Sequence, residues 1–318
     1  MSNKKTAKAF APAGISSFFE ICDTNPDGKP IADLEQVGAL GGGFGLAKGV
    51  YTELTVEEAK NTEISVTING KLAPEAQTTK KTLEALLSNL HKTCSVAVNH
   101  TIEVPVGTGF GTSAGGALTA GLALTRALGL PLTFNQIGKV AHAAEIQCHT
   151  GLGTVSSLAV GGGCIMVVKP GAPGICQIDH IPITPDYMVV AGFFTANTPK
   201  TVLSNPEKKL VINRFGKKTL EAILKKPTLP NFLDLCWSFA QKTGLATEKT
   251  RNLVQLAKEA GAVGAAQNMI GEAVHALVLR ENVKAVEEAF KQVLPTEKVI
   301  VSNLDFMGAR LVGHEKTW

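Results

Sequence analysis

The chain has 318 residues, of which 44% are hydrophobic and 5% aromatic, as expected for a globular protein with one large or two modest domains. Its formal net charge is +4, from 31 basic and 27 acidic residues, which gives no reason to expect a nucleic-acid partner. The sequence has neither a long apolar run after its basic start nor a stretch of about 18 apolar residues. We therefore expect no signal peptide, no membrane contact and a cytoplasmic location.

The spacing of the cysteines also favours a cytoplasmic location. The six cysteines are far apart and form no Cys-x-x-Cys pair, which favours reduced thiols in a reducing compartment over a disulfide framework or a structural zinc site.

The first predicted element is a strand over residues 6–21, interrupted by Pro12 and Gly14. Ser16 and Ser17 form a polar pair inside its apolar run. From the residues alone they are interpreted as a helix N-cap, because serine hydroxyls accept hydrogen bonds from the first N–H groups of a helix.

Residues 23–33 have loop composition, and five glycines follow between positions 38 and 45. These glycines lead into an alternating strand over 51–56, so they lack the helix dipole that a phosphate site uses. We interpret the segment as a bulged hairpin. Residues 63–70 alternate and end in Asn69-Gly70, which predicts a second hairpin.

A helix is predicted over 78–90 from its leucine spacing, and a strand over 95–104. That strand leads into a loop with glycine at 107, 109 and 111, followed by Thr112, Ser113 and a helix rich in small residues over 114–128. Glycine permits positive φ, so successive N–H groups can turn toward one point, and a helix N-terminus favours an anion there. The alternative is a small-residue turn before a buried helix.

Two known phosphate motifs do not match this loop. It lacks the lysine of the Walker A motif, and its third glycine comes too early for the Rossmann spacing.

The next helix is predicted to begin at Thr133, with Gln136 completing a capping box. It carries His142, Glu145 and His149, whose spacing places them on one helix face. That face is either a metal site or a solvated polar surface, and the residues leave both open. Residues 150–169 predict a glycine turn, a small-residue segment and a buried strand.

Residues 169–174 read as a linker, so we predict one domain over 1–172 and a second over 173–318. The second begins with a strand over 186–194, followed by the hydroxyl residues Thr195 and Thr198. Helices are predicted over 205–258 and 281–293. Residues 262–278 predict a small-residue turn into a strand, and 299–312 a strand, a turn and a strand. Alternating strands and helices indicate only an α/β or α+β protein.

The segment from Pro105 to Ala114 resembles the ATP-binding loop of the GHMP kinases, which include galactokinase, homoserine kinase and mevalonate kinase. This resemblance implies an α+β, two-domain α/β sandwich with an N-terminal half like domain 2 of ribosomal protein S5 and a ferredoxin-like C-terminal half. It implies ATP and Mg²⁺ as cofactors. The implied ATP-binding residues are Pro105, Gly107, Gly109, Gly111, Thr112, Ser113 and Ala114.

In this family a glutamate on the helix that here begins at Thr133 binds Mg²⁺, which implies Glu145 with help from the Ser113 hydroxyl. The family's catalytic aspartate, nine residues later, corresponds to Thr154 here. Ser113, Glu145 and Thr154 are thus the implied catalytic positions. Phosphoryl transfer tolerates this departure, because its loose transition state depends mainly on positioning and charge.

Within the family the resemblance is strongest to the archaeal pantoate kinases, from about residue 8 to 312. It implies a small hydroxy acid, pantoate, as substrate in coenzyme A biosynthesis, and early serines that border this acceptor. The implied substrate-binding residues are Ser16, Ser17, His142, Thr195 and Thr198. A homodimer is common in the family.

Related sequences carry an arginine near 165–167 that could pair with the pantoate carboxylate, whereas this chain has Ile165, Met166 and Val167. The nearest cation is Lys169, and lysine does not replace arginine in binding a carboxylate through two hydrogen bonds. Another acid, mevalonate or its phosphate, therefore stays open as the acceptor. A nucleotide-binding regulator with weak catalysis is the other alternative, because Thr154 replaces an aspartate.

Overall fold

The computed structural model describes residues 4–88, 90, 93–194 and 205–313. Its larger sheet contains β1 (Lys5–Cys22), β2 (Gly38–Glu58), β3 (Glu63–Ile68), β4 (Lys71–Leu72), β5 (Cys94–Ile102), β6 (Cys164–Lys169), β7 (Gln177–Ile181) and β12 (Arg310–Val312). Its smaller sheet contains β8 (Tyr187–Phe193), β9 (Gly264–Gln267), β10 (Ala273–Leu279) and β11 (Val299–Asn303). The helices are α1 (Gln77–Leu87), α2 (Thr112–Leu128), α3 (Phe134–Gln147), α4 (Thr154–Val160), α6 (Pro206–Lys225), α7 (Leu229–Lys242), α8 (Glu248–Glu259) and α9 (Val283–Lys291).

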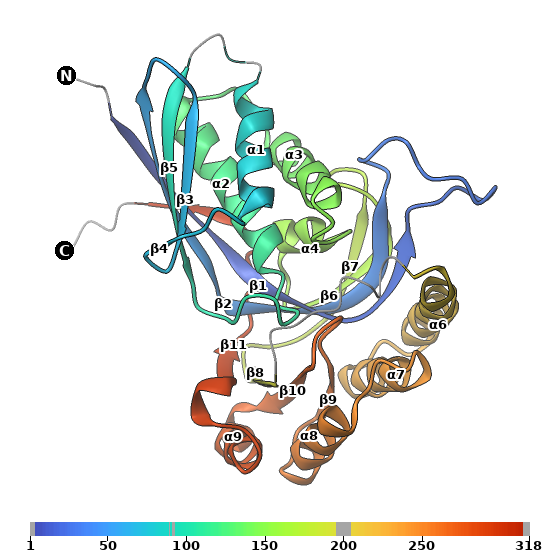
Figure 1. Ribbon diagram of the computed structural model, residues 1–318. Helices are drawn as coiled ribbons and strands as arrows, with labels where there is room; N and C mark the ends of the chain where they lie inside the picture. Colours follow the sequence, from blue (N-terminus) through green and yellow to red (C-terminus); the bar gives the residue numbers. More distant parts are fainter. Residues whose placement is uncertain (1–3, 89, 91–92, 195–204, 314–318) are drawn as a thin grey trace.

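The strand orders are β12-β1-β2-β5-β3-β4 in the larger sheet and β11-β8-β10-β9 in the smaller one. β6 pairs with β2 over the stretch that β5 does not reach, and β7 pairs with β6. Helices α1 to α4 cover one face of the larger sheet, and α8 and α9 pack on the smaller sheet (Figure 1). The predicted mixed α+β class with two sheets is confirmed.

β1 and β2 form one long antiparallel pair with register shifts at Pro12/Ala13 and at Ser16/Phe18. The early strand is therefore confirmed, whereas the N-cap interpretation of its two serines is wrong. The glycine-rich segment belongs to β2 and lies against β1, as a bulged hairpin requires. Glycine is needed for this approach: a Cβ added at Gly43 would lie 1.7 Å from the carbonyl oxygen of Ile15.

α2 is buried along most of its length because small residues let it approach its neighbours closely. A Cβ at Gly115 would lie 3.0 Å from Val50 on β2, and one at Gly121 would lie 2.8 Å from Ile137 on α3. The order predicted from the sequence, strand then glycine loop then buried helix, is confirmed.

Two local predictions are also confirmed. Asn69 and Gly70 both have positive φ, 48° and 78°, at the turn between β3 and β4. Thr133 accepts from the Gln136 N–H while the Gln136 side chain accepts from the Thr133 N–H, which completes the capping box of α3.

The two sheets do not divide the chain at residue 172, and the domain boundary predicted there stays a prediction. β7 extends the larger sheet to Ile181, and β12 returns to that sheet beside β1 after β11 has completed the smaller one. Apolar packing joins the larger sheet to α7. Phe18 of β1 and Phe44 of β2 contact Phe232 of α7 edge to face, at ring-centroid distances of 6.1 and 5.6 Å.

None of the helices in the described ranges has the length and apolar character that crossing a membrane needs.

The capping box offers a test of local stability. We expect Thr133→Ala to lower the free energy of unfolding by about 1 kcal/mol, because the first turn of α3 loses its side-chain acceptor. Thr228→Ala is the matched control, since exposed Thr228 is the N-cap residue of α7 without a side-chain cap hydrogen bond. Urea unfolding followed by circular dichroism measures both variants, and equal losses would contradict the role of the cap.

Candidate active site

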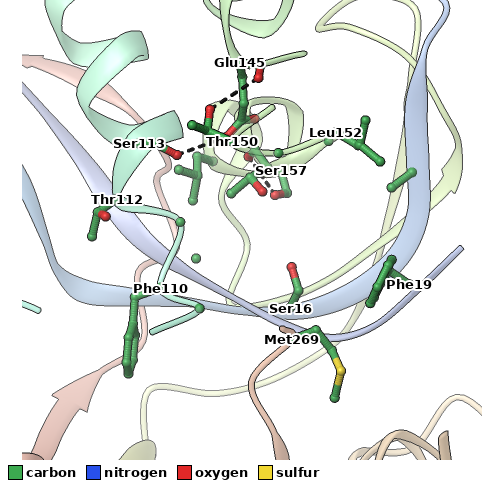
Figure 2. Close-up of a pocket in the computed structure, with 18 of the residues that line it drawn as sticks. Ser16, Phe19, Phe110, Thr112, Ser113, Glu145, Thr150, Leu152, Ser157 and Met269 are labelled. Carbon is green, nitrogen blue, oxygen red and sulfur yellow. Dashed lines mark hydrogen bonds between the residues drawn. The ribbon is translucent and has the colours of Figure 1, made fainter. Parts of the chain in front are cut away.

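A cavity of about 980 Å³ lies where the glycine loop meets β1, β2 and the N-terminal ends of α1, α2 and α4 (Figure 2). The end of α3 and the loop between β9 and β10 complete its wall. Segments distant in sequence thus converge on one hollow.

The glycine loop has the conformation its sequence predicts. Gly107, Gly109 and Gly111 have φ of 80°, 85° and 62°, values that strain other residues. Space is also limited: a Cβ on Gly111 would lie 2.7 Å from the Thr154 methyl carbon, and one on Gly109 would lie 3.1 Å from Asn268. The loop ends at Gly111, the N-cap residue of α2, with no side-chain cap hydrogen bond. The first N–H groups of α2 therefore keep their capacity to bind an anion.

Most of the predicted ATP-binding residues line this cavity: Gly107, Gly109, Gly111, Thr112 and Ser113. Pro105 and Ala114 do not. The Pro105 carbonyl accepts from the Thr108 hydroxyl at 3.1 Å, which shapes the loop, and Ala114 is fully buried beneath it. The side chains of these two positions therefore lie outside the cavity wall, and their contact with ATP stays a prediction.

Glu145 reaches the cavity from α3 and is only 1% exposed. The Ser113 hydroxyl donates to its Oε1 at 3.4 Å (Figure 2), whereas Oε2 is buried without a hydrogen-bond partner among the described residues. A Cβ on Gly151 would lie 2.5 Å from Oε1, so glycine at 151 makes room for the carboxylate. Burial raises the pKa of Glu145 to about 7, although the Ser113 hydroxyl and the Val155 N–H act in the opposite direction.

These groups fit a magnesium ion. An unpartnered carboxylate oxygen beside a hydroxyl provides the hard oxygen ligands that Mg²⁺ accepts, with phosphate and water to complete its shell. The predicted face of His142, Glu145 and His149 is not assembled: His149 lies beyond the end of α3, exposed and with φ of 54°. Within the described ranges, no three His, Cys, Asp or Glu side chains gather to hold a metal.

Only some of the residues predicted to bind the acceptor line the cavity. Ser16 lines the cavity (Figure 2), but Ser17 is fully buried and bonds His275 Nε2 at 2.9 Å. His142 is also fully buried, and its Nε2 donates to the Val37 carbonyl at 2.9 Å. The prediction that Ser17 and His142 contact the substrate is therefore corrected, because both side chains face the protein interior. Thr195 and Thr198 lie outside the described residues.

Thr154 begins α4 and lines the cavity beside the glycine loop. Its methyl group faces Gly111 and Gly14, at 2.7 and 3.6 Å from where their Cβ atoms would be. The position that the resemblance singles out is thus in the site, with a hydroxyl in place of a carboxylate.

Sequence reasoning missed the threonine hydroxyls at the start of α1, which lie at the cavity beside Thr150. The Thr78 and Thr150 hydroxyls lie 3.1 Å apart, and both residues line the cavity (Figure 2 labels Thr150). Thr79 bonds His100 Nε2 at 3.1 Å, and burial lowers the pKa of His100 to about 4. α1 was predicted as a helix, but which of its residues face the cavity depends on how it docks against β5 and α2.

The comparisons with known proteins agree with this geometry. Residues 77–163 match the family model described as the GHMP kinases N terminal domain. The pantoate kinase of Thermococcus kodakarensis is 32% identical over 88% of this chain and 90% of its own length. The chain therefore belongs to the GHMP kinase family.

Two further similarities are informative. A solved structure described as a phosphotransferase related to the CoA biosynthesis pathway has a TM-score of 0.82 and 28% identity, covering 96% of this chain and 98% of its own. The mevalonate kinase of Thermococcus sibiricus is 25% identical over 69% of this chain and 70% of its own length. The pantoate kinase similarity thus extends over more of the chain.

Buried Glu145 makes stability depend on pH. Its folded-state pKa lies above the unfolded value, so as pH rises from about 4.5 to 7 the unfolded chain loses its proton first, and folding stability falls. We expect Glu145→Gln to be more stable than the native protein at pH 8 by a few kcal/mol, since one pKa unit corresponds to about 1.4 kcal/mol. The difference should shrink toward pH 5.

Thermal unfolding at both pH values, with a chelator present, tests this expectation. Glu84→Gln is the control, because Glu84 is an exposed carboxylate on α1. A stability gain that is the same at pH 5 and pH 8 would show that the charge of Glu145 is not its cause.

Proposed function

We propose that this protein is an ATP-dependent kinase that phosphorylates pantoate to 4-phosphopantoate in coenzyme A biosynthesis. The observation that carries the proposal is the glycine loop at the N-terminus of α2, which faces the buried Glu145 carboxylate across one cavity. The extent of similarity to the pantoate kinase of T. kodakarensis supports the acceptor. A cytoplasmic location and a homodimer stay predictions.

Each part of the site has a chemical task in this proposal. The loop N–H groups and the α2 N-terminus bind the nucleotide phosphates. Glu145 and Ser113 would hold Mg²⁺, which neutralises phosphate charge when bound. The Glu145 carboxylate has to lose its proton to serve as a ligand, so metal affinity rises with pH around neutrality.

The acceptor hydroxyl lies beside Ser16 and Thr154 in this proposal. Thr154 cannot take a proton as a carboxylate would, so transfer relies on alignment and charge neutralisation, which a loose transition state permits. Thr195 and Thr198 stay predicted acceptor contacts.

The first experiment measures ADP release from Mg²⁺-ATP by the purified protein, with pantoate, mevalonate and homoserine supplied separately. We expect turnover with pantoate. Turnover with mevalonate alone would keep the kinase and change its acceptor. Measurable ATP binding without turnover of any acid would favour the nucleotide-binding regulator.

The two metal-binding candidates provide a direct test of the site. We expect Ser113→Ala and Glu145→Gln each to lower kcat/KM by at least about 100-fold, because each removes charge stabilisation that develops during transfer. Ser95→Ala is the control, since exposed Ser95 lies on β5 away from the cavity. Native turnover in both site variants would contradict the assignment.

A substitution at Thr154 distinguishes an efficient kinase from one weakened by the loss of a catalytic carboxylate. A general base typically contributes 10²–10⁴-fold, so a crippled enzyme should gain about that much from Thr154→Asp. We expect a gain below about 10-fold, because the native site already relies on positioning. Thr154→Ser is the control: it keeps the hydroxyl and removes the methyl group that faces Gly111. A gain above 100-fold with aspartate would favour the regulator.

A further inference from the structure

Within the described ranges, neither lysine nor arginine lines the cavity wall. Its ionisable side chains are the carboxylates of Asp23, Glu75 and Glu145 and the imidazoles of His100 and His149. Ile165 and Val167 line the segment where an arginine was considered. A hydroxy acid brings a carboxylate into this space, and a buried carboxylate needs a positive partner.

One lysine lies directly behind this wall. Asp23 follows the end of β1 and lines the cavity, and its Oδ1 is bonded to Nζ of Lys209 on α6. The two side chains are only 35% and 22% exposed, so the pair is shielded from solvent more than a typical surface salt bridge.

The backbone around this pair is firmly placed. The Asn213 side chain on α6 accepts from the Ile21 N–H at 2.8 Å and donates to the Ile21 carbonyl at 2.9 Å. A Cβ at Gly216 would lie 2.2 Å from the Phe19 carbonyl oxygen, so α6 packs directly on β1. Figure 1 shows α6 beside this end of the β1–β2 pair. The first turns of α6 therefore hold the base of the Lys209 side chain at a defined point.

We propose that Lys209 binds the carboxylate of the acceptor at the Asp23 end of the cavity. This inference rests on the proposed function, because it concerns a hydroxy-acid substrate. An ammonium group has three donors, of which Asp23 uses one, and the flexible lysine stem lets the others reach a ligand. Asp23 keeps the lysine at the wall, but its own carboxylate faces the cavity and repels the substrate carboxylate.

This arrangement predicts opposite effects for the two members of one ion pair. Lys209→Met removes the positive partner, so KM for the hydroxy acid should rise by at least 10-fold while KM for ATP stays within about 2-fold. Asp23→Asn removes the competing negative charge but keeps a side-chain oxygen that can accept from the Lys209 ammonium, so KM for the acid should fall. A pair that serves only to hold α6 on β1 would be damaged in the same direction by both substitutions.

The experiment measures steady-state kinetics with pantoate and with its primary amide, which lacks the charge. Lys209→Met should raise KM for the acid but leave KM for the amide nearly unchanged. Lys209→Arg keeps the positive charge but changes its geometry, so KM for the acid should rise less than in Lys209→Met. Lys208→Met is the matched control, because Lys208 is the exposed neighbour on α6.

Several outcomes would overturn the inference. Unchanged KM for the acid in Lys209→Met, or equal losses for acid and amide, would show that Lys209 does not bind the carboxylate, while native turnover leaves the kinase proposal standing. If circular dichroism shows that Lys209→Met does not fold, the Asp23→Asn variant tests the proposal instead. A raised KM for the acid in Asp23→Asn would contradict the proposal. A native protein silent with every hydroxy acid overturns both the function and this inference.

Discussion

The close approach of β1 and β2 is the constraint on which the site depends. Helices contact this strand pair where glycine leaves room: α2 and α4, which line the cavity, at Gly115 and Gly14, and α6 behind it at Gly216. The loop between β9 and β10 joins it through a backbone hydrogen bond from Met269 to the Ser16 carbonyl at 2.8 Å. Side chains at the glycine positions would push these segments apart, so small residues here determine where functional groups meet.

Electrostatics at the site follows from that compactness. Glu145 is buried, and one of its carboxylate oxygens has no hydrogen-bond partner among the described residues, which destabilises its charged form. Within the described ranges, the cavity wall presents the N-terminal end of α2 and neither lysine nor arginine. In the proposed function, a bound cation and the nucleotide phosphates would offset the cost of charging Glu145.

Local signals in the sequence predicted much of this structure. The Asn69-Gly70 turn, the Thr133 cap and the glycine loop each depend on the conformation of a few consecutive residues. Sheet membership of β7 and β12 was not predicted, because it depends on partners far along the chain.

The direction of individual side chains could not be predicted from the sequence either. Ser16 and Ser17 are neighbours at a register shift in β1, and only the pairing with β2 and the smaller sheet decides which faces the cavity. His142 has the right helical spacing to Glu145 but turns toward the Val37 carbonyl. Spacing predicted the helix, the family resemblance pointed to Glu145, and tertiary contacts decided which neighbouring side chains face the cavity.

The corrected position of Ser17 shows how the smaller sheet supports the site. Asn268 Oδ1 accepts from His275 Nδ1 at 2.8 Å, which leaves His275 Nε2 to accept from the Ser17 hydroxyl. Burial lowers the pKa of His275 to about 3, so this link stays neutral near physiological pH, where Glu145 titrates. Asn268 also packs where a side chain on Gly109 would lie. An uncharged pair of hydrogen bonds therefore links β1 to Asn268, which packs against the glycine loop, and in the proposed function protonation of Glu145 would change metal affinity without charging that link.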